Sequence, residues 1–537
     1  MSHIGRPPFD EASIHGARHD TVACTATQKR WVLVATIVGS SMAFIDGTIV
    51  NVALPSIQQS LRATAADAQW VVESYALLLA SLLLVGGSLG DHFGRRRIFV
   101  VGVVFFAIAS VACAMSQRID FLIMARALQG IGAALLVPGS LALISASFPE
   151  GERGKAIGTW SGFSGITAAV GPVLGGVLVD HYSWIWAFLV NIPFAMVVVY
   201  AARHIPESDG GGKQGPLDYV GAVLATIGLG GITFAFIEAP VRHWTSAAVI
   251  ASMAVGLIAT ASFLVVQARS RFPMLPLGLF RNRNFAGTNV LTLLLYGALG
   301  GGLYYLPLNL IQVQGFSATA AGAALLPFIA IMFLLSRWAG QLVDKVGPKL
   351  PLVAGPLIAG AGFVLFAVPG VGVGYWGSFL PAVVVLGVGM AITVAPLTTT
   401  VMNSVGPDQA GIASGVNNAV SRAASLLALA VFGIVMAVAF DVALMSRLAS
   451  LGVDSGVRDF YVGQLDRLAG AELPPNVADS LKSSLKAAVG EAFVSGFRWV
   501  MSISAGLAVL SAVSAWVWIE RVPKVAAEAV NAPPIGG

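Results

Sequence analysis

Long apolar stretches, separated by short polar segments, run along this chain from residue 31 to residue 519. A helix needs about 20 apolar residues to cross the hydrocarbon core of a bilayer. Fourteen stretches have about that length: 31–55, 69–90, 98–116, 121–146, 155–179, 184–202, 217–237, 246–267, 285–312, 319–342, 350–369, 376–398, 411–437 and 496–519. The pattern predicts an all-α membrane protein with fourteen transmembrane helices. An even number places both termini on one side.

The polar segments between these stretches differ in charge. Most Lys and Arg residues fall in loops on one side, whereas the short loops of the other side hold only Arg62, Arg118 and Arg242. Cytoplasmic loops carry an excess of Lys and Arg. The basic loops, and both termini with them, are therefore predicted to lie in the cytoplasm.

One short motif occurs twice, each time in a basic loop between two apolar stretches. The first copy is GSLGDHFGRRR at 87–97 and the second is GQLVDKVGPK at 340–349. Internal repeats of this kind are typical of transporters built from two related halves. The motif residues singled out here are Gly87, Asp91, Gly94, Arg95, Arg96 and Asp344.

The motif predicts a conformational clamp on the cytoplasmic side. Asp91 is expected at a helix end, with Arg95 and Arg96 just beyond it. These side chains can bond to each other and to nearby helix ends. We expect the contacts only when the cytoplasmic ends of the two halves approach, so that they favour an outward-open state.

The two copies also predict how the chain divides. Each follows the second span of a six-span group, which leaves two spans inserted between the groups. The predicted parts are a cytoplasmic tail 1–30, a six-helix bundle 31–206, two inserted helices 214–268, a second six-helix bundle 284–520 and a cytoplasmic tail 521–537.

The longest segment between spans, 438–495, is predicted to lie outside the cell. Apolar residues at three-to-four spacing around Tyr461 and after Ala478 predict two short amphipathic helices, separated by Pro474 and Pro475. This segment either forms a solvated cap over the last two spans or offers a docking site to an accessory periplasmic protein.

Composition supports a chain that is embedded in the bilayer along its whole length. Hydrophobic residues make up 56% and charged residues 11%, whereas soluble domains carry about 25% charged residues. The net charge of +5 is read as a topology signal, and no nucleic-acid partner is expected. The two cysteines have no metal or disulfide spacing. The sequence contains no nucleotide-binding or hydrolase motif, so neither an enzyme nor a cofactor or metal is predicted.

Charges inside spans are the strongest functional candidates, because a charge at the bilayer centre costs about 2.5–3.5 kcal/mol. Asp46 in the first span and Arg126 in the fourth are expected at similar depth in the outer half of the membrane. They either exchange a proton during a cycle or form a static ion pair. Glu73, near the outer end of the second span, either takes part in proton coupling or faces interfacial water.

Polar and aromatic side chains within other spans suggest a substrate cavity. They either line a water-filled space or belong to packing contacts and the interfacial belt. The expected cavity residues are Asn51, Gln129, Tyr296, Tyr304, Asn309 and Arg422.

The fifth span is rich in glycine. Gly171, Pro172, Gly175 and Gly176 form its most concentrated stretch. Small residues let helices approach closely, and a proline removes a backbone hydrogen bond and bends the helix. The stretch serves either plain helix packing or a bend that sets how the halves close.

Together these motifs resemble the major facilitator superfamily and, within it, the fourteen-span drug:proton antiporter family. The resemblance rests on the segment from Asp46 to Pro55, the loop motif, the RALQGIG segment at 126–132 and the GPVLGG segment at 171–176. It implies the major facilitator fold in the cytoplasmic (inner) cell membrane. It also implies proton-coupled multidrug export of small hydrophobic or amphiphilic compounds. A dedicated metabolite exporter or an uptake permease of the same fold is the alternative, and a non-transporting sensor fits less well.

Two departures from the family pattern concern the outer end of the first bundle. Thr167 stands where the family usually has a glycine, and the family's Trp-Arg-Trp is replaced by Trp184, Ile185 and Trp186. The missing arginine removes an expected partner either of nearby Asp180 or of a neighbouring loop. The chemistry of the outer gate is therefore left open by the sequence.

Overall fold

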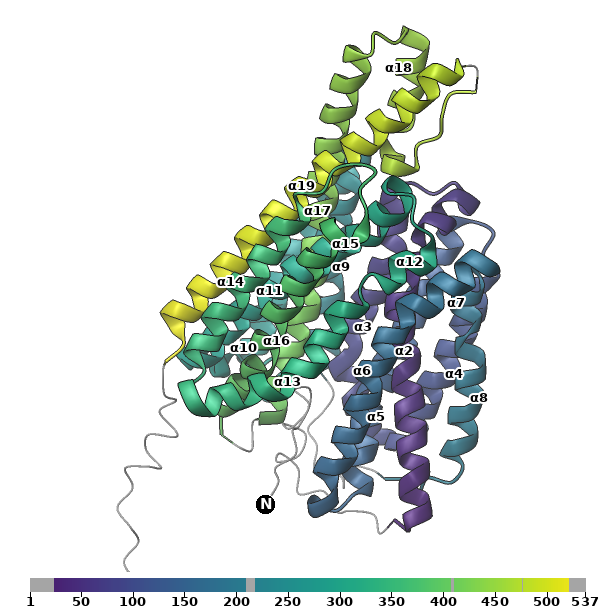
Figure 1. The fold of residues 1–537 in the computed structure, drawn as a ribbon. Helices are drawn as coiled ribbons and strands as arrows, with labels where there is room; N and C mark the ends of the chain where they lie inside the picture. Colours follow the sequence, from purple (N-terminus) through teal and green to yellow (C-terminus); the bar gives the residue numbers. More distant parts are fainter. Residues whose placement is uncertain (1–23, 209–217, 407–409, 476, 521–537) are drawn as a thin grey trace, which may run out of the picture.

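The protein is described here by a computed structural model that covers residues 24–208, 218–406, 410–475 and 477–520. Helices account for the secondary structure of these ranges, and no β-strand occurs in them. The predicted all-α class is confirmed. Figure 1 shows long helices arranged in two groups, with a smaller helical cap at one end.

Between residues 24 and 208, the described part of the N-terminal half, seven helices follow one another. They are α2 (Ala26–Leu61), α3 (Ala65–Phe93), α4 (Arg95–Ala114), α5 (Ile119–Ser147), α6 (Glu150–His181), α7 (Trp186–Leu189) and α8 (Asn191–Ala202). Capping residues fix where α2 and α3 begin. Thr25 and Thr64 each form a capping box with the residue three positions later. Gly94, at φ +100°, makes the sharp turn between α3 and α4.

The C-terminal half repeats this plan. Its helices are η1 (Leu277–Arg281), α11 (Arg283–Leu308), η2 (Asn309–Val313), α12 (Ala318–Ala323), α13 (Leu326–Val346), α14 (Lys349–Phe366), α15 (Tyr375–Ser378), α16 (Leu380–Asn403), α17 (Ala410–Ser450) and α19 (Asp479–Trp518). Gly347, at φ +75°, turns the chain between α13 and α14 as Gly94 does in the first half. The repeated motif thus marks equivalent corners of the two halves.

The two inserted helices are α9 (Tyr219–Arg242) and α10 (Ala247–Arg269). They pack on each other, and α9 also packs on α3 and on α17. One contact with the N-terminal half is the hydrogen bond from Trp70 Nε1 to Glu238 at 3.1 Å. The inserted pair therefore lies beside a seam between the halves.

The long segment near the C-terminus differs from its prediction. The helix expected after Ala478 is the beginning of the 40-residue helix α19, because no proline interrupts that stretch. Helix α17 likewise continues to Ser450. The cap therefore consists of the extended ends of α17 and α19 with α18 (Ser455–Val462) and η4 (Leu465–Gly470). We call this end of the bundle the cap end, and the opposite end, where α2 begins, the basic end.

The predicted number of spans is supported in part. Eleven described helices are long and apolar enough to cross a membrane, and the number is twelve if α3 is counted as one bent span. Within the fifth and sixth predicted spans, the described residues form the shorter apolar stretches Val170–His181 and Trp186–Ala202, and the first of these is part of the 32-residue helix α6. The count of fourteen remains a prediction.

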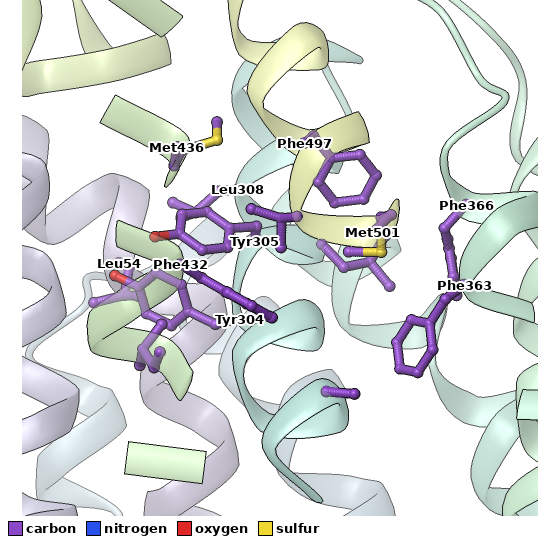
Figure 2. Packing of buried hydrophobic residues seen from close by; sticks show 14 of the residues in the cluster. Leu54, Tyr304, Tyr305, Leu308, Phe363, Phe366, Phe432, Met436, Phe497 and Met501 are labelled. Atoms are coloured by element: carbon purple, nitrogen blue, oxygen red, sulfur yellow. The ribbon is translucent and has the colours of Figure 1, made fainter. Parts of the chain in front are cut away.

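A large apolar core joins the halves near the cap end. Figure 2 shows Tyr304 and Tyr305 of α11 beside Phe432 of α17, with Leu54 of α2 close to the two tyrosines. Phe497 of α19 lies farther along the same cluster. The core thus includes side chains from both halves, so closure at this end buries apolar surface.

Candidate functional site

A buried ion pair joins two helices of the N-terminal half. Arg126 on α5 lies against Asp46 on α2, with 2.5 Å between Nη1 of the guanidinium and Oδ2 of the carboxylate. The two side chains are only 1% and 0% exposed. Opposite charges are tolerated at such depth because each compensates the other. The predicted proximity of the two side chains is confirmed.

Neutral side chains complete the network around the carboxylate. Gln129 Nε2 donates to Asp46 Oδ1 at 2.7 Å, and Asn191 Nδ2 donates to the same oxygen at 3.2 Å. Gln129 also donates to Ser110 Oγ at 2.8 Å and accepts from Arg126 at 2.6 Å. The network ties together α2, α4, α5 and α8. Protonation of Asp46 would leave Arg126 as an uncompensated buried cation, which would favour another arrangement of these helices.

Arg126 is also held by groups other than the carboxylate. Its Nε donates to the carbonyl of Val71 at 2.9 Å, and its guanidinium carbon lies 4.3 Å from the centre of the Tyr75 ring. A desolvated cation over an aromatic face gains about 2 kcal/mol. Arg126, which belongs to α5, is thus held by α3 independently of its ion pair with Asp46.

The network differs from the expectation in two respects. Gln129 was expected in the substrate cavity, but the structure places it inside the ion-pair network with no exposure. Asn191, Ser110 and Tyr75, which also belong to the network or contact it, were not singled out from the sequence. Asn191 offered a signal, since an amide within an apolar helix needs a partner. Ser110 and Tyr75 offered none, because a serine commonly bonds its own helix, as Ser110 Oγ does with Phe106 at 2.9 Å, and a tyrosine suits many positions.

Glu73 is a second acidic side chain inside the bundle. It is 1% exposed, and neither carboxyl oxygen has a hydrogen-bond partner among the described residues. One turn earlier on α3, Gln69 donates to the carbonyl of Leu429 on α17 at 2.8 Å, so this face of α3 points towards the C-terminal half. An ionised carboxylate without a partner would cost several kcal/mol here, so these surroundings favour the neutral acid over the carboxylate.

The expected cavity residues of α11 and its extension have different surroundings. Tyr304 is buried within the aromatic group of Figure 2. Asn309 is also buried, and its Oδ1 accepts from Gln314 Nε2 at 3.0 Å. Tyr296 is half-buried, and its carbonyl accepts from Ser425 at 3.1 Å.

Two other expected cavity residues have unused polar groups. Arg422 on α17 is half-buried and forms no ion pair or hydrogen bond with the described part of the chain. Oδ1 of Asn51 on α2 is buried, again without a partner in the described ranges. Such groups are available to a bound molecule or to water, since a buried polar atom is rarely left unpaired.

The glycines of α6 divide between two neighbours. At Gly171 and Gly175 a Cβ would overlap Thr48 and Ile49 of α2, within the same half. At Gly176 a Cβ would overlap the carbonyl oxygen of Ala318, which belongs to α12 in the other half. The stretch thus packs one face of α6 inside its own half and the other face across the interface.

The repeated motif makes its observed contacts within the N-terminal half. Asp91 accepts from Arg95 Nε at 2.8 Å, and the backbone N–H of Arg96 donates to Glu207 at 2.9 Å. A Cβ at Gly94 would lie 2.8 Å from the carboxyl carbon of Glu207. Gly87 lies opposite Pro138 of α5. The side chain of Asp344, in the second copy, lies outside the described part of the structure.

The dependence of these bonds on the approach of the two basic ends stays a prediction. Within the N-terminal half, Glu207 supplies a partner to the motif. The hydrogen bonds found between the halves in the described part of the chain lie at the cap end. They are Gln58 with Gln312, Gln69 with Leu429, and Asp180 with Ala318 and Thr319.

Two helical halves with paired motifs and buried charges define a polytopic membrane transporter. The model of the Major Facilitator Superfamily matches residues 36–429, and the chain belongs to this superfamily. Its structural neighbours include a bacterial homolog of the human lysosomal transporter Spinster in an inward-facing, occupied conformation. That match has a TM-score of 0.64 at 17% identity and covers 93% of this chain and 99% of the other. It supports the fold alone.

Several relatives are named for resistance or export. The multidrug resistance protein Stp of Mycobacterium tuberculosis is 32% identical over 511 residues, covering 91% of this chain and 92% of Stp. The puromycin resistance protein pur8 of Streptomyces alboniger is 32% identical, covering 96% of each chain. The tetracenomycin C resistance and export protein of Streptomyces glaucescens is 34% identical, covering 80% of this chain and 79% of that protein. These family members and structural neighbours are transporters, not enzymes.

Proposed function

We propose that the protein is a proton-coupled antiporter that exports small hydrophobic or amphiphilic compounds across the cytoplasmic membrane by alternating access. The observation that carries the proposal is the buried ion pair of Asp46 and Arg126. The carboxylate oxygen and the guanidinium nitrogen lie 2.5 Å apart, and the side chains around the carboxylate are neutral. The names of the relatives support export of drug-like compounds.

The proposed cycle uses the ion pair as a switch. When the cap end opens, a proton from outside neutralises Asp46 and frees Arg126. The unpaired arginine makes that arrangement costly, which favours return to the state open at the basic end. Loss of the proton to the cytoplasm then restores the pair. The present structure, with the pair intact and the halves joined at the cap end, corresponds to the inward-facing stage of this cycle.

The proposal includes a topology. Fourteen helices cross the membrane, the basic end faces the cytoplasm, and both termini lie there. The cap lies outside the cell. Because the cap is built mainly from extensions of α17 and α19, a solvated cap over the last two spans is the simpler role for it. The alternative is that an accessory periplasmic protein binds its surface.

The motif and glycine residues receive structural roles in this cycle. Asp91, Arg95 and Arg96 fix the corner between α3 and α4 to the segment 205–208 that follows α8. Gly347 marks the equivalent corner near Asp344. Gly171 and Gly175 hold α6 on α2, so that the N-terminal half moves as one unit.

The substrate is proposed to bind between the halves, near Glu73, Tyr296, Tyr304 and Arg422. Aromatic and apolar surface with few polar groups is typical of sites for drug-sized ligands. A neutral Glu73 adds an acidic group that could pair with a weakly cationic compound after losing its proton. Highly charged solutes would lack partners there.

Transport by the purified protein tests this function. Proteoliposomes carrying an imposed proton gradient are given cationic, neutral and anionic compounds, and uptake of each is compared with and without a protonophore. Gradient-driven movement of lipophilic compounds against the direction of proton flow is expected. Transport of one polar metabolite alone, or movement in the direction of the protons, would instead favour a dedicated metabolite exporter or an uptake permease.

A further inference from the structure

Asp180, which the sequence left without a partner, forms a bond between the two halves at the cap end. Its Oδ1 accepts from the backbone N–H of Ala318 at 3.0 Å, and its Oδ2 accepts from the N–H of Thr319 at 2.8 Å. Oγ1 of Thr319 donates to Oδ2 at 2.6 Å. Asp180 lies in the last turn of α6, whereas Ala318 begins the apolar helical stretch 318–335 of the other half. A carboxylate from one half therefore caps a helix of the other.

The backbones around this bond approach as closely as glycine allows. A Cβ at Gly176 would overlap Ala318 and Thr319, and a Cβ at Gly322 would overlap the carbonyl of Pro172. Gly176 and Gly322 thus let α6 and α12 meet directly. The three bonds of Asp180 depend on that approach, because two of their donors are backbone groups of α12.

Other charged groups at the cap end do not replace α12 as a partner. Asp180 lines a cavity of about 530 Å³ together with Arg62, Arg467 and Glu472. Arg467 pairs with Glu472 at 2.9 Å, and neither arginine forms an ion pair with Asp180 among the described residues. Ile185 occupies the position where the family commonly has an arginine.

We propose that Asp180 is the latch of the outer gate, which closes when its carboxylate caps the helix that begins at Ala318 and opens when α12 leaves it. This role rests on the alternating-access cycle of the proposed exporter, and it adds a residue to which that cycle assigned no part. The helix cap joins the two halves directly through the contacts of Asp180 with Ala318 and Thr319.

The latch does not sense the proton gradient. Partial burial raises the pKa of Asp180, but the hydrogen bonds from Thr319 and Ala318 outweigh it and hold the pKa below its ordinary value. A carboxylate whose pKa is lowered when the gate closes stabilises the closed gate at any pH above its free pKa of about 3.9. That stabilisation is lost only as the pH falls through the lower pKa of the closed gate. The latch therefore stays charged at neutral and mildly acidic pH, and proton coupling is left to groups such as Asp46.

Distances between spin labels test the latch in purified, full-length protein in lipid nanodiscs. The background carries Cys24→Ser and Cys113→Ala, and its export activity is verified first. One label pair, at Ser60 and Ala320, reports the cap end, and another, at Lys155 and Lys345, reports the basic end; all four side chains are exposed. Asp180→Ala should raise the ratio of cap-open to cap-closed molecules by about five- to thirty-fold. The basic-end distance should shorten in the same molecules.

Matched variants separate the latch from a general loss of structure. Asp120→Ala removes an exposed carboxylate that pairs with Arg118 of the same half at 2.9 Å, and should leave both distances unchanged. Asp180→Asn and Thr319→Val, which remove part of the bonding, should give smaller shifts in the direction of Asp180→Ala. The ratio between variant and wild type should stay constant from pH 5.5 to pH 8.

The readout is independent of the proposed transport function, because it needs neither substrate nor gradient. Unchanged distances in folded Asp180→Ala would overturn the latch while leaving the exporter proposal in place. An effect equal to that of Asp120→Ala would also overturn it. A shift that disappears between pH 8 and pH 5.5 would contradict a latch that keeps its charge.

Discussion

The two halves satisfy polar side chains inside the bundle in different ways. The N-terminal half holds a charged network centred on Asp46 and Arg126. In the C-terminal half, Asn417 of α17 donates to Thr292 Oγ1 at 2.7 Å and to Asn289 Oδ1 at 3.2 Å, both on α11. All three members of that second cluster are neutral. Two halves of related fold can thus provide hydrogen-bond partners for their buried polar side chains with or without charged residues.

The difference bears on which half can respond to a proton. An amide–hydroxyl cluster has one protonation state at any physiological pH, so it can only hold helices together. Arg422, one of the charges within the helices of the C-terminal half, does not lose its proton either. Asp46 and Glu73 can change charge, and both belong to the N-terminal half. We therefore expect proton coupling to be lost through changes in the N-terminal half and kept through changes in the C-terminal cluster.

The largest effect is expected from Asp46→Asn. The amide keeps the size of the side chain but cannot be protonated, and the charge of Arg126 is no longer compensated. Gradient-driven export should fall to background, at least about a hundredfold, while the protein remains inserted. Efflux of a lipophilic dye from cells, with expression matched by immunoblot, measures the effect. Undiminished efflux at equal expression would remove Asp46 from the mechanism.

A smaller effect is expected when the other partner is changed conservatively. Arg126→Ala leaves the carboxylate buried without a cation, which costs about 3–5 kcal/mol. Arg126→Lys keeps the charge but loses the planar fork that serves Asp46, Gln129 and Val71 together. Export should be lower in the alanine variant, and its thermal unfolding temperature should drop more. Equal export and stability in the two variants would argue against an ion-pair role.

Much of this N-terminal arrangement could be predicted from the sequence. Asp46 and Arg126 are charges within apolar spans, and the depth of each follows from its distance to the span ends. The repeated motif correctly marks the same corner in each half, because a positive φ at Gly94 and Gly347 is a local property of the chain. Signals of this kind depend on one helix or one turn.

Contacts between distant segments could not be obtained in this way. Glu207 reaches Arg96 from beyond α8, and Asp180 reaches Thr319 from the other half. Neither residue belongs to a sequence pattern from which its partner could be predicted. Of the two short helices expected in the cap, the one around Tyr461 is present as α18, whereas the one after Ala478 was wrong for a related reason: α19 continues through that segment, whose amphipathic pattern alone indicated a short helix. Tertiary packing decides these features.

A third variant, Glu73→Gln, tests the other group that can change charge in the N-terminal half. Because the surroundings of Glu73 favour its neutral form, the amide should alter the thermal unfolding temperature little. Export of cationic compounds should fall about tenfold, whereas export of neutral compounds should be less affected. Concentration-dependent efflux of a matched cationic and neutral dye measures this difference. Equal losses for both dyes would assign Glu73 to packing or to general proton coupling.

The smallest effects should come from a matched pair of amides. Asn417→Ala removes two hydrogen bonds between neutral groups, and Asn191→Ala removes a hydrogen bond to the Asp46 carboxylate. Bonds between neutral groups contribute about 1 kcal/mol each and bonds to charged groups about 1.5–3 kcal/mol. Asn417→Ala should therefore lower the unfolding temperature slightly, keep more than about half of the export activity and leave its pH profile unchanged. Asn191→Ala should reduce export about tenfold and alter the pH profile, because its partner Asp46 is the group that we propose exchanges the proton. If Asn417→Ala alters the pH profile as much as Asn191→Ala does, proton coupling is shared by both halves.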